Sequence, residues 1–557
     1  MRRHEQTLDE TLAFRQVIPR WRSPADSTAE VAQYQVDGPT RPSTRAEHWF
    51  AKVAERYVEH PDSDTATDLV EVAFVLGREP AHPSVVGLAR SLSATTVLDQ
   101  GRTGSKQAAV PSEEELRTKI QQLRDQVRRF PKQPLAWSEL SRAYISLGHT
   151  QKASQAMVCA LGSAPRNHYL LRSASRLFTL LDEPDRALTL LRRHGGLGQN
   201  PHLLSAELAI ASSAQLPLRH ERLAEQMLAD KKYSPRHLAE LAAAVGTIEH
   251  QHGKHKRAKA RFMQSLKSPT ENSLAQAYWI SKQDSKIVIP EQAWNVPRPH
   301  EANAFAFRER QDWQGVAREC AAWLRDQPFD ASPALMGSYC GVLPSLETDA
   351  EAIATAGLVA HPHHSGLLNN RAVSRLYIGD LDGARIDIEK ATFESSSDAH
   401  LLATMGLLAF RSGELELGRE LYLKSILWFK DCGEKASVLL STLHWLREEV
   451  RLGSIGVHEV LDGLRAQVEA MQRTRRGPDI ALIYRLILIE AEAMHRYGTQ
   501  QFNFPSSPSL AGAVGEFTAR LGVPDVVLQE ASNILHTSDT RTLATVPKIE
   551  SFNALMS

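Results

Sequence analysis

The chain has 557 residues and a mass of 61.9 kDa, and 42% of its residues are hydrophobic, enough for one large core or a long row of small ones. Its 65 basic and 65 acidic residues give no formal net charge and a pI near 7.4, which argues against a protein that wraps nucleic acid over its whole surface. The four cysteines form no Cys-x-x-Cys pair, which argues against a zinc knuckle or a disulfide framework and fits a reducing cytoplasm.

Residues 1–46 are expected to form an N-terminal extension. The start, MRRHEQTLDETLAFRQVIPRWR, has charges where a signal peptide needs an unbroken apolar stretch, and no window elsewhere approaches eighteen consecutive apolar residues. We therefore expect a protein that is neither exported nor membrane-spanning. Phe14, Val17, Ile18 and Trp21 stand among arginines in a segment too short to bury them alone. Such a segment is either disordered or docked on a surface, and its aromatic and arginine content favours docking, onto this chain or onto a partner.

Two further segments precede the main body of the chain. Residues 47–97 contain three helical patterns, EHWFAKVAERYVEH, TATDLVEVAFVLG and PSVVGLARSLSATTVL, which predict a small bundle or an atypical cap. Residues 98–112, with the sequence LDQGRTGSKQAAVPS, read as a flexible linker.

From residue 113 onward the hydrophobic pattern is helical almost everywhere, and Pro or Gly interrupts it at short intervals, as in RRFPKQP and RDQPFDASP. One stretch, 134–165, recurs in outline at 367–391 and 401–426. The first copy contains Trp137, Leu140, Tyr144, Gly148, Ala153, Ala160 and Pro165; the second contains Leu368, Ala372, Gly379, Ala384 and Ala391; the third contains Leu402, Gly406, Gly413 and Tyr422. Small residues at a fixed spacing let the two helices of a hairpin approach closely, while larger ones fill the surrounding grooves.

This pattern resembles the tetratricopeptide repeat family. The resemblance implies an all-α, right-handed α-α superhelix, a solenoid preceded here by the N-terminal cap or bundle. We expect the array to span 113–270 and 300–497, with a degenerate repeat or bend at 271–299, where SKQDSKIVIPEQAWNVPRPH breaks the pattern. That stretch is a connector, a bend or a loop that contacts a partner. Residues 498–557 are expected to form short helices and an extended tail.

Motifs of enzyme chemistry are absent from the sequence. It has no phosphate-binding Gly-x-x-x-x-Gly-Lys-Ser/Thr, no dinucleotide-binding Gly-x-Gly-x-x-Gly after a strand, no His-Glu-x-x-His and no Gly-x-Ser-x-Gly. We therefore expect no catalytic residues and no cofactor.

Two groups of histidines fall at predicted hairpin turns and could in principle bind a transition metal. They are His250, His252 and His255 in EHQHGKHKR, and His361, His363 and His364 in HPHHSG. Neither group has a carboxylate or thiolate companion at helical spacing. We interpret both as solvated turns and predict no metal.

The densest basic run follows the first histidine group. It comprises Lys254, Lys256, Arg257, Lys259 and Arg261. Binding to nucleic acid would need stacking aromatics beside these charges, but the one aromatic nearby, Phe262, falls at a core position of the repeat. The sequence therefore favours a solvated helix face over a nucleic-acid surface.

The resemblance also implies a concave groove that holds peptides or partner helices. LLNNRAV resembles the asparagine-bearing repeat of carboxylate-clamp members, with Asn370 in the matching place, but the neighbouring repeats depart from that pattern. The predicted groove is instead mainly apolar. It comprises Phe305, Tyr339, Asn369, Asn370, Val373, Leu376, Tyr377, Leu407 and Phe410. Such a strip fits an amphipathic helix or an extended apolar peptide. The alternatives are that these residues are ordinary core or that the protein itself fills the groove.

Together these features predict a non-catalytic scaffold or adaptor that binds one or more proteins in a multi-protein complex. Arginine far outnumbers lysine, which is typical of a GC-rich bacterial genome, and we expect a cytoplasmic protein. The alternative is a regulatory or sensing subunit that controls a nuclease or toxin and contacts nucleic acid through the basic run.

Overall fold

The computed structural model describes residues 14–23, 52–56, 69, 112–230, 233–343, 345–394, 398–452 and 457–497. Residues 52–56 are helical, but the rest of the bundle predicted at 47–97 lies, apart from Leu69, outside the described residues. The predicted linker, apart from Ser112, and the predicted C-terminal helices and tail after residue 497 also lie outside them.

The described part of the chain contains helices and no strands. Its first elements are α6 (Glu113–Arg129), α7 (Pro134–Ser146), α8 (Thr150–Ser163), α9 (His168–Leu180), α10 (Pro184–Arg193), η1 (Leu197–Gln199), α11 (Pro201–Ser213), α12 (Glu221–Ala229), α13 (Pro235–Gln251), α14 (His255–Ser265) and α15 (Glu271–Ser281). The middle elements are η2 (Glu291–Trp294), α16 (His300–Glu309), α17 (Trp313–Asp326), α18 (Ala331–Ser338) and η3 (Tyr339–Val342). The last are α19 (Glu347–Ala360), α20 (Ser365–Ile378), α21 (Leu381–Glu394), α22 (Ala399–Arg411), α23 (Leu415–Asp431), α24 (Lys435–Leu452), α25 (Val457–Met471) and α26 (Gly477–Tyr497).

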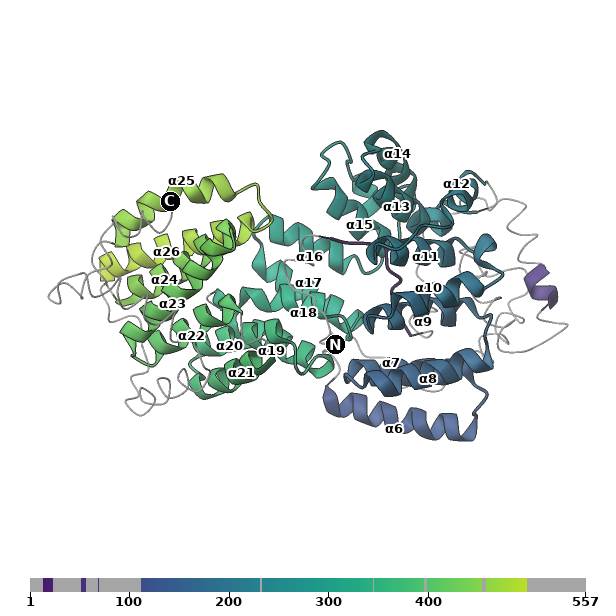
Figure 1. Cartoon of the computed structure of the whole chain (residues 1–557), viewed down its shortest axis with the longest axis horizontal. Coiled ribbons are helices and arrows are strands. Elements are labelled where there is room, and N and C mark those ends of the chain that lie inside the picture. The colour runs from purple at the N-terminus through teal and green to yellow at the C-terminus, as the bar shows by residue number, and fades with distance from the viewer. Residues whose placement is uncertain are drawn as a thin grey trace.

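Most consecutive helices of the described residues pack against each other, and the result is an α-α superhelix, as the sequence predicts (Figure 1). Small residues form the crossings. Ala372, Ala384 and Ala391 are completely buried in the hairpin α20–α21, and Gly379 ends α20 with a φ of 96°, a left-handed conformation that glycine adopts without strain. The small residues of the repeat are therefore packing contacts.

The region predicted as degenerate contains a regular helix followed by an irregular stretch. Thr270 caps α15 through a reciprocal pair of side-chain hydrogen bonds with Ser273. After Ser281 the chain has no α-helix until His300, and only the short η2 interrupts it. The irregular stretch therefore spans residues 282–299, and the first part of the predicted range 271–299 is helix α15.

The start of the superhelix returns to its middle. Helix α7 contacts α19, and a Cβ atom added to Gly148, in the turn after α7, would lie 2.8 Å from the carbonyl oxygen of Ala360 at the end of α19. Residues that are far apart in sequence therefore surround a common central space, and the described N-terminal segment lies there (Figure 1).

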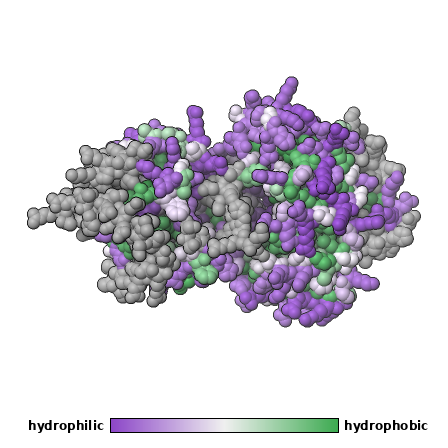
Figure 2. All heavy atoms as spheres, in the orientation of Figure 1, coloured by the Kyte–Doolittle hydropathy of each residue, from purple (hydrophilic) through white to green (hydrophobic). Residues whose placement is uncertain are grey.

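The face of the molecule shown in Figure 2 is mostly hydrophilic over the described helices, with smaller hydrophobic areas among them. Among the described residues, no helix combines the length and the apolar character needed to cross a membrane.

Candidate functional site

Residues 14–23 run without regular secondary structure through the inner side of the superhelix, between the early helices and α15–α18 (Figure 1). Val17 and Trp21 are buried, with exposed fractions of 0% and 1%. The sequence marked both as docking residues, and the structure places them on this chain. We call residues 14–23 the inner segment.

Apolar contacts anchor the inner segment at three points. The Trp21 ring lies 5.5 Å from that of Phe329, measured between centroids, and Val17 belongs to the apolar cluster that contains Phe262. Phe14 is 38% exposed and meets Trp279 edge to face at 6.2 Å. Aromatic pairs in these geometries contribute about 0.5–1.5 kcal/mol beyond the area they bury. Ile18, the fourth predicted docking residue, is half-buried.

Side chains of the solenoid also bind the main chain of the inner segment. Two of these donors come from α15: Gln276 Nε2 donates to the carbonyl of Arg15 at 2.9 Å, and Asn272 Nδ2 donates to the carbonyl of Ile18 at 3.0 Å. Gln327 Nε2 donates to the carbonyl of Trp21 at 3.3 Å. The Tyr169 hydroxyl donates to the carbonyl of Arg22 at 2.7 Å. The amide of Trp21 in turn donates to Gln327 Oε1 at 3.2 Å. Main-chain hydrogen bonds give affinity without depending on the ligand's side chains, as in other complexes that hold an extended peptide.

Three arginines of the inner segment meet buried carboxylates. Arg15 Nε and Arg20 Nη2 both lie 2.5 Å from Glu301, one on each carboxylate oxygen. Arg22 forms a two-pronged contact with Asp326, at 2.8 and 2.9 Å. Two parallel hydrogen bonds of this kind fix the geometry as well as the charge of the pair.

A fourth carboxylate contact belongs to the same network. Arg22 Nη1 pairs with Glu271, the first residue of α15. Arg298, from the irregular stretch after α15, approaches Asp326 at 3.2 Å from another side. The acidic side chains therefore come from α15, α16 and α17, and the inner segment connects all three helices.

The arginines determine the ionisation of these carboxyl groups. Burial alone would raise the pKa of Glu271, but Arg22 and Arg20 outweigh it and hold the pKa at about 2. The same opposition, with Arg15 and Arg20 as the cations, leaves the pKa of Glu301 below its ordinary value, and Arg22 lowers that of Asp326. All three groups are carboxylates at neutral pH, as the ion pairs require.

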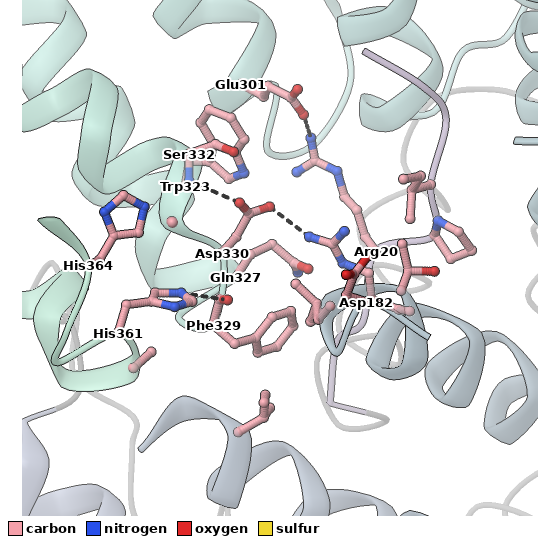
Figure 3. Close-up of a pocket in the computed structure, with 18 of the residues that line it drawn as sticks. Arg20, Asp182, Glu301, Trp323, Gln327, Phe329, Asp330, Ser332, His361 and His364 are labelled. Atoms are coloured by element: carbon pink, nitrogen blue, oxygen red, sulfur yellow. Dashed lines mark hydrogen bonds and ion pairs between the residues drawn. The ribbon is translucent and has the colours of Figure 1, made fainter. Parts of the chain in front are cut away.

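Beside the inner segment lies a cavity of about 530 Å³ (Figure 3). Arg20 and Ile18 line one side of it, and the turns after α7, α9 and α19 line the others. Across it, Asp330 accepts a hydrogen bond from Arg176 at 2.7 Å. Figure 3 shows Asp330 between Arg20 and the two histidines His361 and His364.

The second histidine group is therefore not a solvated turn as a whole, which corrects the interpretation from the sequence. His361 donates to the carbonyl of Phe329 at 3.0 Å and lines the cavity. His364 is buried and caps the start of α20 by accepting a hydrogen bond from the amide of Leu367. His363 is the exposed member. The contact of the α19–α20 turn with Phe329, which spacing along the chain does not reveal, leaves His361 half-buried.

The predicted apolar groove is divided between two places. Tyr339, Asn369, Asn370, Val373 and Leu407 line one small cavity of about 110 Å³, too small for a peptide segment. Phe305, half-buried, lines the large cavity beside the inner segment.

The two asparagines of the small cavity already have partners within the solenoid. Asn370 Nδ2 donates to Ser338 Oγ at 2.9 Å, and Asn369 Oδ1 accepts from the Thr404 hydroxyl at 2.7 Å. In the structure as it stands, these amides join neighbouring repeats to one another.

Three residues of the predicted groove occupy other environments. Leu376 and Phe410 are core residues with exposed fractions of 1% and 3%, because the helices behind them close over that face. The Tyr377 ring is covered by the guanidinium groups of Arg411, Arg447 and Arg451. Their carbon atoms lie 5.0, 4.8 and 5.1 Å from its centroid. The prediction that these three residues form part of an open apolar strip is therefore wrong.

The basic run lies on the outer face of α14 and the turn before it. Lys254, Lys256 and Lys259 are exposed, and Arg261 is half-buried. Arg257 pairs with Glu225 and with Glu249, the latter at 2.8 Å. Phe262 is completely buried, as the repeat pattern predicts, so it cannot stack on a base.

The first histidine group has a carboxylate neighbour that the sequence did not reveal. His250, His255 and Asp284 each offer a ligand atom, and these atoms all lie within 4.8 Å of one another. Burial and the nearby His255 lower the pKa of His250. Asp284 belongs to the irregular stretch after α15. The spacing of residues within the α13–α14 turn therefore could not identify it as a neighbour of the two histidines.

The structure thus defines a helical solenoid that holds an extended, arginine-bearing segment on its inner side. No family of known proteins matches the chain, and no curated protein matches it. Among solved structures 67 chains match. One is a structure of Naa15/Naa10 bound to HypK-THB, which has 11% sequence identity and a TM-score of 0.20 and is matched over 88% of this chain and 86% of that one. A TM-score this low supports no conclusion about function.

Proposed function

We propose that this protein is a non-catalytic scaffold or adaptor of the tetratricopeptide type, which holds an extended, arginine-bearing segment of a partner protein on its inner side. The main support for this proposal is the way in which the solenoid holds the inner segment. Ten consecutive residues are held there by main-chain hydrogen bonds, two buried apolar anchors and three arginines that pair with buried carboxylates. A partner with the same charges and anchors would find every contact preformed.

The chemistry of the groove indicates which segments it accepts. Glu301 takes two arginines five residues apart, and Asp326 with Glu271 takes a third two residues later. Trp21 fills the apolar site between the second and third arginine. Removing one partner of a buried ion pair leaves an uncompensated charge that costs about 3–5 kcal/mol, so segments without these arginines are rejected.

The inner segment competes with any such partner, because it is tethered to the groove that it fills. It competes as part of the same molecule, so a partner binds when its affinity or its local concentration overcomes this intramolecular competition. The same chain can in this way be closed on itself or open to a partner. We infer that the protein assembles with proteins in the cytoplasm of a bacterium and that it carries no cofactor.

The alternative function, a regulator of a nuclease or toxin that contacts nucleic acid, has weaker support. The basic run lies outside the groove, and its one nearby aromatic is buried. Arg257 is already paired with two glutamates. These features are typical of a solvated helix surface.

A selection of displayed peptides tests the proposal. The bait is the full chain with Arg15→Ala, Arg20→Ala and Arg22→Ala, which removes from Glu271, Glu301 and Asp326 the guanidinium groups of the inner segment. Enriched peptides should carry arginine or lysine at the spacing of the three replaced residues, with an aromatic residue just before the last. The matched control bait carries Glu301→Gln and Asp326→Asn in addition, and circular dichroism verifies that both baits are folded.

The control bait should lose the enrichment, because it lacks the two carboxylates that select the arginines. If both baits enrich the same peptides, or neither enriches any, the groove does not bind partners in this way.

A further inference from the structure

The turn between α13 and α14 brings two metal-ligating side chains together with one from the stretch that follows α15. His250 lies in the last turn of α13, His255 is the first residue of α14, and Asp284 follows α15. His255 Nδ1 and Asp284 Oδ2 are 3.8 Å apart, and the two imidazole rings meet edge to face with their centroids 4.8 Å apart. The third histidine of the turn, His252, is exposed.

The backbone holds these residues in place. Gly253 makes the turn with a φ of 73°, and the amide of Lys254 donates to the carbonyl of Glu249 at 2.8 Å. Asp284 is fixed at both ends, because its amide donates to the carbonyl of Ile280 at 2.9 Å and its Oδ1 accepts from the amide of Lys286 at 3.0 Å. The three side chains therefore need only small rotations to adjust to one another.

We propose that His250, His255 and Asp284 form a binding site for a divalent transition metal ion such as Zn²⁺. Two imidazoles and one carboxylate are a ligand set that such ions accept, with water in the remaining position. Bonds of about 2.0–2.2 Å in tetrahedral geometry place neighbouring ligand atoms about 3.3–3.6 Å apart, somewhat closer than the 3.8 Å between His255 Nδ1 and Asp284 Oδ2. Binding would draw the three ligands together.

The charges around the site set its strength. Within the described part of the chain, Asp284 has no lysine or arginine in ion-pair contact, so its carboxylate is open to a cation. The carbonyl end of α13 favours a cation near His250, whereas the start of α14 and the exposed Lys254 and Lys256 oppose one. We therefore expect a reversible site that is saturable by free metal and not a permanently loaded one.

An occupied site would connect the α13–α14 turn to the stretch that follows α15. Its three side chains are not among those that hold the inner segment, so metal binding and peptide binding can be tested with different substitutions. Because the ion binds the folded arrangement and not the unfolded chain, saturation should raise the midpoint of thermal unfolding.

Isothermal titration of the full chain with Zn²⁺ tests the site. The chain contains 22 histidines, so the result depends on matched variants. His255→Ala and Asp284→Asn should each weaken the tightest binding at least tenfold and abolish the zinc-dependent shift in the unfolding midpoint. His252→Ala removes an exposed histidine of the same turn and should leave both unchanged.

Titration with Co²⁺ gives a second readout, since its visible absorption reports the coordination geometry directly. The wild-type protein and His252→Ala should give the spectrum of a low-coordinate site that His255→Ala lacks. The proposal is overturned if wild-type protein shows no saturable binding, or if His255→Ala and Asp284→Asn bind Zn²⁺ as the wild type does.

Discussion

Glu271, Glu301 and Asp326 stay charged in the interior because the arginines of the inner segment lie against them. Arginine fits this role better than lysine, since its planar guanidinium donates two parallel hydrogen bonds and keeps its charge when buried. Burying each ion pair costs desolvation free energy, and only well-aligned hydrogen bonds between the two groups offset that cost. Each arginine therefore favours one position along the groove. At this scale, the inner segment is specified by charge as much as by hydrophobicity.

The stability that these three carboxylates contribute should depend on pH. The folded-state pKa values of Glu271, Glu301 and Asp326 lie below their ordinary values, that of Glu271 at about 2. Such groups contribute stability that is fully present above their unfolded pKa, near 4–4.5, and is lost as the pH falls toward the folded value. Between pH 7 and pH 3, Glu271 alone should lose about 1–2 kcal/mol of its contribution.

Urea unfolding at pH 7 and pH 3 measures this loss. The control is the variant with Arg15→Ala, Arg20→Ala and Arg22→Ala, which lacks the cations that lower these pKa values. The difference in unfolding free energy between the two proteins should shrink in acid. A difference that stays constant between the two pH values would show that these carboxylates are not held by the arginines.

Sequence reasoning reached half of this site. Val17 and Trp21 could be identified because apolar residues among arginines in a short segment have nowhere local to be buried. Their partners could not be identified, since Glu271 and Asp326 look like any other acidic residues at helix ends. Only the folded superhelix, which brings α7, α9 and α15–α18 around one space, gives them their roles.

At the scale of elements, the crossings of helices depend on residues without bulk. In α19, a Cβ added to Gly357 would lie 2.4 Å from Cβ of Ala334 in α18 and 3.2 Å from Leu367 in α20. Neither neighbour can move far, because both are completely buried. The glycine therefore sets how closely these three helices approach.

Gly357→Ala should lower the unfolding free energy by about 1–3 kcal/mol, the usual cost of overpacking a filled core. Gly162→Ala in α8 is the matched control, because a Cβ there meets nothing within 4 Å and alanine is the better helix former. That variant should be unchanged or more stable by up to about 1 kcal/mol. Equal effects of the two substitutions in denaturant unfolding would contradict the packing account.

The helical elements were the most predictable part of the molecule, because the repeat fixes small residues at each crossing and glycine at the turn. The groove was less predictable. Leu376 and Phe410 share the apolar character of groove residues, and periodicity alone does not distinguish an inner surface from a core that a third helix covers.

At the scale of the whole molecule, the inner segment links regions that are far apart in sequence. It contacts Arg142 and Tyr169 of α7 and α9 on one side, and α15, α16 and α17 on the other. The contact of α7 with α19 brings the same regions together independently. A linear solenoid pattern does not encode such a return, since it depends on the summed curvature of many helix pairs.

The central claim is that the groove recognises this segment as a ligand, and exchange of the segment tests it most directly. A site for a specific protease is inserted into the full chain between residues 24 and 46, so that cleavage leaves the segment bound without a tether. A labelled peptide of residues 14–23 is then added, and gel filtration with fluorescence detection follows its incorporation.

We predict that the cleaved segment stays with the protein and that the labelled peptide replaces it. Peptides carrying Trp21→Ala or Arg22→Ala should be incorporated at least tenfold more weakly, because each loses a buried anchor or a buried ion pair. Incorporation of all three peptides to the same extent, or of none, would contradict the account and leave the inner segment as a structural part of the fold.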